Sequence, residues 1–128
     1  MKNIVTAFSS FSVKDIDEAK AFYKDTLGLE VNEDNKMHLL NIILPGTSIM
    51  LYPKPDHKPA AFTVCHIVVK DIEIAVDEAI EKGVTFIQYD EPMKTTEKGI
   101  YHGQYGETLA WFTDPSGNIL AFVQYTTK

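Results

Sequence analysis

The stretch Leu109–Gln124, with the sequence LAWFTDPSGNILAFVQ, carries the strongest fold signal in the chain. Its two apolar runs flank the cluster DPSGN at residues 114–118. Within this cluster Pro115 fixes φ near the value that a turn needs, and Gly117 can adopt a positive φ. Two apolar runs joined by such a turn are typical of a β-hairpin. We therefore predict a hairpin near the end of the chain.

Composition and charge narrow the class of protein. The chain has 128 residues, of which 45% are hydrophobic and 23% charged, as expected for one globular domain with a core. The net charge of −6 argues against a nucleic-acid or anionic-membrane partner and suits a neutral or cationic small ligand. No apolar run approaches the roughly 20 residues of a membrane span.

The first six residues alternate like a strand rather than a signal peptide, and the single cysteine, Cys65, fits a reducing compartment. We expect a soluble, cytoplasmic protein.

The chain contains an internal duplication. Val13-Lys14-Asp15-Ile16 recurs 56 residues later as Val69-Lys70-Asp71-Ile72, and each copy predicts the start of a helix. Asp15 is a suitable N-cap with Glu18 three residues later, whereas the second helix lacks this capping box. Glycines 28 and 83 are expected to end the helices. The inner faces are predicted from helical spacing to be Ile16, Ala19, Phe22, Tyr23 and Leu27 in the first helix, and Ile72, Ala75, Val76, Ala79 and Ile80 in the second.

Strand-like segments surround each helix in the same order. In the first half they are residues 4–13, 29–33, 37–44 and 48–52; in the second they are 61–69, 84–89, 108–113 and 118–125. The pattern is β-α-β-β-β twice, an α+β fold. We predict one domain, residues 1–128, made of a first module at 1–54, a linker at 55–60 and a second module at 61–128. Prolines 53, 55 and 59 mark the linker.

The paired module resembles the vicinal oxygen chelate superfamily of glyoxalases, bleomycin-resistance proteins and extradiol dioxygenases. The resemblance rests on Val-x-Asp before each helix, Phe22-Tyr23 with Leu27-Gly28 at the end of the first, and Asp114-Pro115-x-Gly117-Asn118. It implies two curved mixed sheets, each cupping a cavity, with the helices on the convex side. It also implies a homodimer.

Similar proteins hold a divalent metal with His, Glu or Gln at four positions, which fall here on Phe8, Met50, Val64 and Ala121. None of these side chains has a lone pair that suits a hard or borderline cation, and such a site needs several converging ligands. We therefore predict that the metal centre is missing, together with its Lewis-acid chemistry, and that no other cofactor replaces it.

The histidines and the cysteine leave several possibilities open. His66 lies two residues after Val64 and should share its sheet face, either as a solvated or hydrogen-bonded side chain or as a ligand contact or proton carrier. A metal site moved to His66, His102 and Glu107 is conceivable, but the spacing of these three residues along the chain matches no metal-binding motif. His57 in the linker is expected to be solvated, and the facing of His38 is left open. Cys65 should face the helix as a small apolar residue.

Residues 91–107 form a long loop that holds three of the seven glycines. Its rings Tyr101, His102 and Tyr105 could close over an apolar ligand while glycines 99, 103 and 106 act as hinges, or the loop could be solvated. Trp111 could be a pocket wall or part of the core beneath the helix, because the hairpin register decides its facing.

The favoured hypothesis is a metal-independent protein that binds a small molecule in an apolar and aromatic cup. The predicted ligand contacts are Phe8, Ser10, Met50, Val64, His66, Tyr101, His102, Trp111 and Ala121. The alternative is a lyase, isomerase or dioxygenase of the same superfamily, with a displaced metal or none and with His66 or His102 as general base. A third hypothesis is a regulatory partner whose cup is filled by its own side chains.

Overall fold

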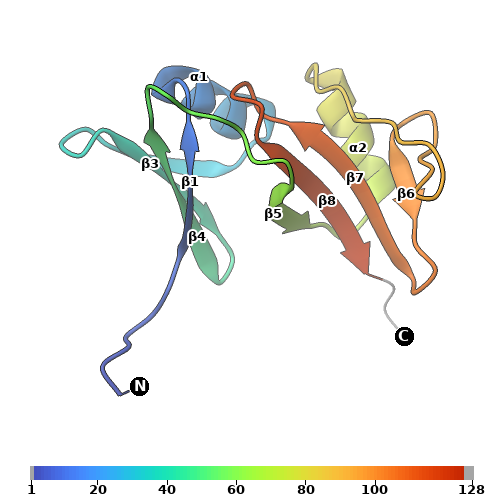
Figure 1. Cartoon of the computed structure of the whole chain (residues 1–128), viewed down its shortest axis with the longest axis horizontal. Helices are drawn as coiled ribbons and strands as arrows, with labels where there is room; N and C mark the ends of the chain where they lie inside the picture. The colour runs from blue at the N-terminus through green and yellow to red at the C-terminus, as the bar shows by residue number, and fades with distance from the viewer. Residues whose placement is uncertain (1, 126–128) are drawn as a thin grey trace. The chain divides into compact units, whose positions relative to one another are not determined.

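The computed structural model describes residues 2–125 and divides the chain into two compact units, Met1–His57 and Lys58–Lys128 (Figure 1). Each unit contains a four-stranded mixed sheet and a helical segment. The predicted α+β class with two modules in one chain is thereby confirmed.

In unit 1 the elements are β1 (Ser9–Val13), α1 (Ile16–Lys20), the π-helical η1 (Ala21–Thr26), β2 (Glu30–Asp34), β3 (Leu39–Leu44) and β4 (Thr47–Pro53). The strand order is β1-β4-β3-β2, with β1 and β4 parallel and the other pairs antiparallel. Pro45 and Gly46 make the turn between β3 and β4, as predicted, with Gly46 at a φ of 79°.

The first helix begins and ends where the sequence predicts. The Asp15 side chain accepts a hydrogen bond of 2.9 Å from the Glu18 amide, which caps the helix N-terminus. After Lys20 the helix widens, so that the Leu27 amide donates to the Phe22 carbonyl at 2.9 Å. Gly28, at a φ of 70°, ends it. The Lys20 ammonium lies 2.8 Å from Glu33 Oε1 and links the helix to β2, and this contact raises the pKa of Lys20.

The first strand is shorter than predicted. It begins at Ser9 rather than at residue 4, and Phe8 precedes it as a largely exposed side chain. The reason is the length of the neighbouring strand: Ser9 pairs with Ile49, and β4 itself begins only two residues earlier, at Thr47. A longer β1 would have little backbone to pair with.

In unit 2 the elements are β5 (Thr63–Val68), α2 (Ile72–Glu81), β6 (Ile100–His102), β7 (Glu107–Thr113) and β8 (Ile119–Tyr125). The strand order is β5-β8-β7-β6, with β5 and β8 parallel. The predicted hairpin is β7–β8. Asp114 organises its turn, because its carboxylate accepts hydrogen bonds from the amides of Ser116 and Asn118, each at 2.9 Å.

The predicted strand at residues 84–89 is wrong. In its place the structure has a single bridge, Phe86 to Phe112, and the edge strand is Ile100–His102, inside the stretch predicted as a loop. Two segments pair with the same side of β7. Phe86 forms a bridge with Phe112, and β6 pairs with residues 108–110. Val84 and Phe86 alternate like a strand because both side chains are buried, although their backbone is not in a ladder.

Helix α2 packs on one face of the second sheet, against β7 and β8 (Figure 1). Asp71 caps it by accepting a 3.1 Å hydrogen bond from the Ile74 amide, and Gly83 follows its end at a φ of 95°. Ile72, Val76 and Ala79 are buried as predicted, but Ile80 is exposed. The buried stripe of α2 is therefore narrower than the helical spacing suggested, and Ile80 lies in the last turn, one residue before the helix ends at Glu81.

Candidate functional site

The strand register separates the two faces of the second sheet. His66, Ala121 and Trp111 are register partners across β5, β8 and β7, so they share one face. The next row contains Phe122 and Ala110, which lie on the side of the buried core and α2. We call the first surface the open face of unit 2. Trp111 thus lies on the side away from α2, which decides between the two alternatives for this residue in favour of a pocket wall.

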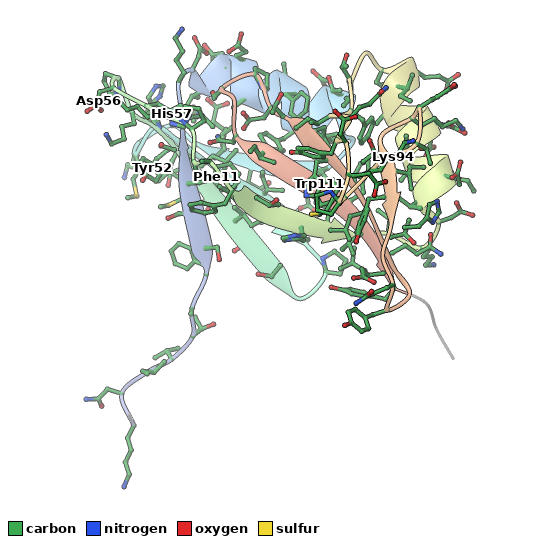
Figure 2. All side chains as sticks on the ribbon, turned by 45° about the vertical axis from the view of Figure 1, so that its right-hand side comes forward. Phe11, Tyr52, Asp56, His57, Lys94 and Trp111 are labelled. Atoms are coloured by element: carbon green, nitrogen blue, oxygen red, sulfur yellow. The ribbon has the colours of Figure 1, made fainter. Side chains whose placement is uncertain are left out.

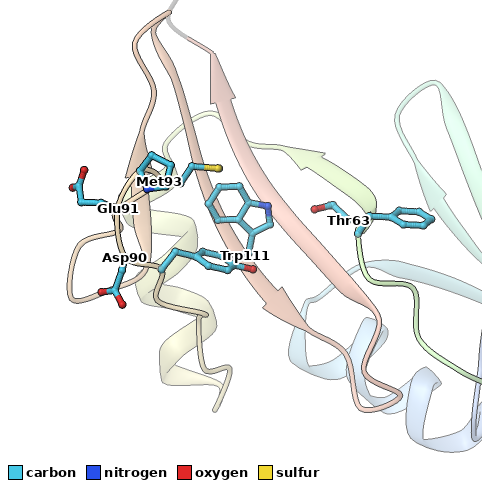
Figure 3. A pocket seen from close by; sticks show the side chains of 8 residues that line it. Thr63, Asp90, Glu91, Met93 and Trp111 are labelled. Atoms are coloured by element: carbon cyan, nitrogen blue, oxygen red, sulfur yellow. The ribbon is translucent and has the colours of Figure 1, made fainter.

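A pocket of about 650 Å³ lies on this side of unit 2. It is lined by Phe62, Thr63, Tyr89, Asp90, Glu91, Pro92, Met93 and Trp111. Figure 3 shows Trp111 in the middle, with Thr63 on one side and Met93 on the other. The volume lies within the range of drug-sized ligand sites, which combine apolar walls with a few polar groups.

Aromatic packing fixes the indole of Trp111. The Tyr89 ring meets it edge-on, with centroids 5.4 Å apart and an interplanar angle of 89°. The Tyr101 ring lies 6.0 Å away at 38°. Trp111 is only 8% exposed, whereas Phe62, Tyr89 and Met93 are 68%, 39% and 42% exposed. The pocket therefore has a fixed floor, and the apolar groups around it are still open to solvent.

The loop that forms one wall is held at both ends. The Tyr89 amide donates to Thr95 Oγ1 at 2.9 Å, and the Thr95 amide donates to the Tyr89 carbonyl at 3.0 Å. Thr95 is one of the few buried polar residues, at 9% exposure. Residues 91–93 line the pocket and belong to the predicted loop of residues 91–107. The two hydrogen bonds between Tyr89 and Thr95 hold this segment at its base.

Sequence reasoning missed the other lining residues. Phe62 and Thr63 were assigned to the predicted strand at 61–69 without a role, and Tyr89 to the strand that does not form. The short segment Tyr89-Asp90-Glu91-Pro92-Met93 has no pattern that by itself predicts a pocket.

The predicted contacts in unit 2 are distributed over both sheet faces. Val64 lies at the irregular register between Thr63 and Cys65, and Ala121 is fully buried beside His66. His66 is exposed. Tyr101 packs on Trp111, but His102 pairs with Thr108 and so belongs to the opposite row. His66 and His102 therefore do not share a face.

This separation argues against the relocated metal site of His66, His102 and Glu107. Among residues 2–125 no group of three His, Cys, Asp or Glu side chains comes together to hold a metal ion. Met50 and Ala121, two of the four positions where similar proteins hold a metal, have Ser10 and His66 as their register partners.

In unit 1, Ser10, Met50 and Asn41 form a row across β1, β4 and β3. Phe8 lies outside this row. His57 is not simply solvated as predicted: its Nδ1 lies 2.6 Å from Ser12 Oγ, at the point where the chain leaves β4 (Figure 2). The predicted contacts Phe8, Ser10 and Met50 remain a prediction, as does the role of the loop as a lid.

Cys65 pairs with Leu120, in the row on the helix side of the second sheet. Burial raises the pKa of its thiol. Its place on the helix side agrees with the prediction, and a raised pKa lowers the thiolate fraction, which disfavours a nucleophilic role.

The model of the Glyoxalase/Bleomycin resistance protein/Dioxygenase superfamily matches residues 5–122. A search of curated protein sequences found no match. Among solved structures, a superfamily member from Sphaerobacter thermophilus DSM 20745 is 26% identical, with a TM-score of 0.72 over 94% of this chain and 98% of that one. A glyoxalase/bleomycin resistance protein/dioxygenase from Alicyclobacillus acidocaldarius is 20% identical, with a TM-score of 0.68 over 98% and 93%. TnmS3, an antibiotic binding protein from Streptomyces sp. CB03234, is 24% identical, with a TM-score of 0.67 over 95% and 98%.

The chain therefore belongs to the glyoxalase/bleomycin resistance protein/dioxygenase superfamily. None of the helices within residues 2–125 is long and apolar enough to cross a membrane.

Proposed function

We propose that this protein binds a small molecule in the pocket of unit 2 and does so without a metal ion. The observation that carries the proposal is the pocket itself: about 650 Å³, with Trp111 as its floor and partly exposed apolar side chains around it. Three apolar side chains exposed around one concavity are typical of a binding site.

Metal independence is supported by the four positions where similar proteins hold a cation. Here these are Phe8, Met50, Val64 and Ala121, and Ala121 is fully buried against its neighbours. Binding requires affinity alone, so a protein of this kind functions without a Lewis acid. TnmS3, which is described as an antibiotic binding protein, has the same fold and supports binding rather than turnover as the activity.

We further propose that the protein is a cytoplasmic homodimer. The resemblance to paired-module proteins supports the dimer, and the single cysteine supports a reducing compartment. Sedimentation of the purified protein at several concentrations tests the dimer, and a mass of 14.4 kDa at all of them would contradict it.

The binding proposal is tested with protein that has been treated with a chelator. The chain has one tryptophan, so a ¹⁵N-labelled sample gives a single indole N–H resonance, that of Trp111. A fragment library screened against this resonance should give shifts that Phe62→Ala abolishes and Tyr125→Ala retains. Phe62 and Tyr125 are both exposed aromatic residues of unit 2, but only Phe62 lines the pocket. If no fragment shifts the indole resonance, the proposal is wrong and the pocket is closed to ligands.

A second candidate function is catalysis with His66 as general base. It is favoured by one observation: His66 is exposed and adjoins Ala121, itself the register partner of Trp111. His102, on the other face, is less suited. A His66→Gln variant that keeps ligand binding but loses conversion of the bound compound would support an enzyme.

A further inference from the structure

We propose that the ligand of this pocket is a flat, uncharged aromatic molecule that carries a hydrogen-bond acceptor. The inference rests on the proposed binding function and specifies the chemical class of the ligand. Its three parts, flatness, lack of charge and the acceptor, come from different groups of the pocket.

Flatness follows from the shape of the floor and one wall. The indole of Trp111 packs against the rings of Tyr89 and Tyr101, and the Tyr89 ring meets it at 89°. The Trp111 and Tyr89 rings thus form two flat surfaces at a right angle. A planar ring system can stack its face on one of these rings and place its edge against the other. Met93 adds a thioether, which interacts favourably with aromatic rings. A bulky saturated ligand would touch the same surfaces at fewer points.

Lack of charge follows from the direction of the ionisable groups. Of the lining residues only Asp90 and Glu91 are charged, and both carboxylates point away from Trp111 (Figure 3). Among the residues that the structure describes, no lysine lines the pocket. Within residues 2–125 every buried side-chain nitrogen and oxygen already has a hydrogen-bond partner. A charged ligand would therefore lose its hydration without gaining a counter-charge inside the pocket.

The acceptor follows from Thr63. Its hydroxyl points toward Trp111 from the opposite side of the pocket to Met93 (Figure 3). It forms no hydrogen bond with another described residue, so it is available to donate to a ligand. A carbonyl oxygen at the edge of a flat ring system is the simplest matching group.

The experiment uses four compounds that share one bicyclic skeleton. 2-Naphthamide is flat, neutral and carries a carbonyl acceptor. 2-Naphthoate is its isosteric anion and keeps the acceptor oxygen, 2-naphthamidine is its isosteric cation and lacks an acceptor as well, and decahydronaphthalene-2-carboxamide is its saturated analogue. Each is titrated into the full chain while the Trp111 indole resonance is followed, and calorimetry gives an independent dissociation constant.

The amide is expected to bind at least about tenfold more tightly than either charged compound, because neither charge is compensated inside the pocket. It should also bind about three- to tenfold more tightly than the saturated amide. Thr63→Val should weaken amide binding about two- to tenfold, which corresponds to the loss of one hydrogen bond. The control Thr113→Val, on an exposed threonine of the same unit that does not line the pocket, should leave it unchanged.

The possible failures are distinguishable. If either charged compound binds as tightly as the amide, or if the saturated amide does, the ligand class is wrong while the binding function stands. Equal amide affinity of Thr63→Val and the wild type would overturn the role of Thr63. If none of the four compounds binds but other fragments shift the indole resonance, the ligand class is again refuted. If no compound of any class shifts it, the proposed function itself fails.

Discussion

Replacing Thr95 by valine tests whether one hydroxyl holds the pocket wall in place. Thr95 Oγ1 accepts the Tyr89 amide at 2.9 Å, and the residue is only 9% exposed. Valine has nearly the same shape but no acceptor, so the Tyr89 amide would lose its partner. A partly buried donor without a partner costs about 1–2 kcal/mol. We expect Thr95→Val to lower the free energy of unfolding of unit 2 by this amount.

The assay is urea unfolding followed by the fluorescence of Trp111, the single tryptophan, which reports on unit 2. Thr95→Ser keeps the hydroxyl and should recover most of the loss. Thr113→Val changes an exposed threonine and should stay within about 0.5 kcal/mol of the wild type. In the same samples, 2-naphthamide should bind Thr95→Val more weakly. The reasoning is refuted if Thr95→Val and Thr113→Val unfold at the same urea concentration and bind the amide equally.

Three further predictions concern stability and reactivity. Asp114→Ala removes three hydrogen bonds to a buried carboxylate and should lower the free energy of unfolding by about 2–4 kcal/mol in the urea assay; a smaller effect than one hydrogen bond would contradict the turn geometry. Gly99→Ala should cost about 1–3 kcal/mol more than Gly83→Ala, because both glycines have a positive φ but only at Gly99 would the new Cβ lie 2.7 Å from Phe86 Cβ; equal losses would show that Phe86 can move aside. Cys65 should react with a disulfide reagent more slowly than free cysteine at pH 8, because its raised pKa reduces the thiolate, and urea should accelerate it; the same rate with and without urea would show that the thiol is accessible.

The features that the sequence predicts best are those encoded by neighbouring residues. The caps at Asp15 and Asp71 and the turn at residues 114–118 each depend on a side chain that bonds to the backbone two to four residues away. Such contacts form wherever the residue types allow them. The duplication then predicted the β-α-β-β-β order of both units, although in unit 2 the strand after the helix is Ile100–His102 and not residues 84–89.

The features that the sequence did not predict depend on distant pairing. Residues 84–89 alternate like a strand, but they form a single bridge from Phe86 to Phe112, and Ile100–His102 pairs with residues 108–110 of β7 instead. The facing of Trp111 needed the register of β7 with β8. The pocket wall needed the pairing of Tyr89 with Thr95, for which the sequence has no pattern.

Contact of the predicted site residues with a ligand stays a prediction. Trp111 lines the pocket and Tyr101 packs against it, whereas His102 pairs with Thr108 in the opposite row. A change of one residue along a strand reverses the face, and only the strand register fixes this.

The central claim is that the pocket of unit 2 binds its ligand without a metal ion. The most direct test is a titration of 2-naphthamide into chelator-treated protein, followed at the Trp111 indole resonance, and repeated after dialysis against Zn²⁺, Ni²⁺ and Mn²⁺ with the bound metal measured by elemental analysis. We expect the same dissociation constant in every sample and no stoichiometric metal. Stoichiometric metal in the dialysed protein, or binding that occurs only when metal is present, would contradict it.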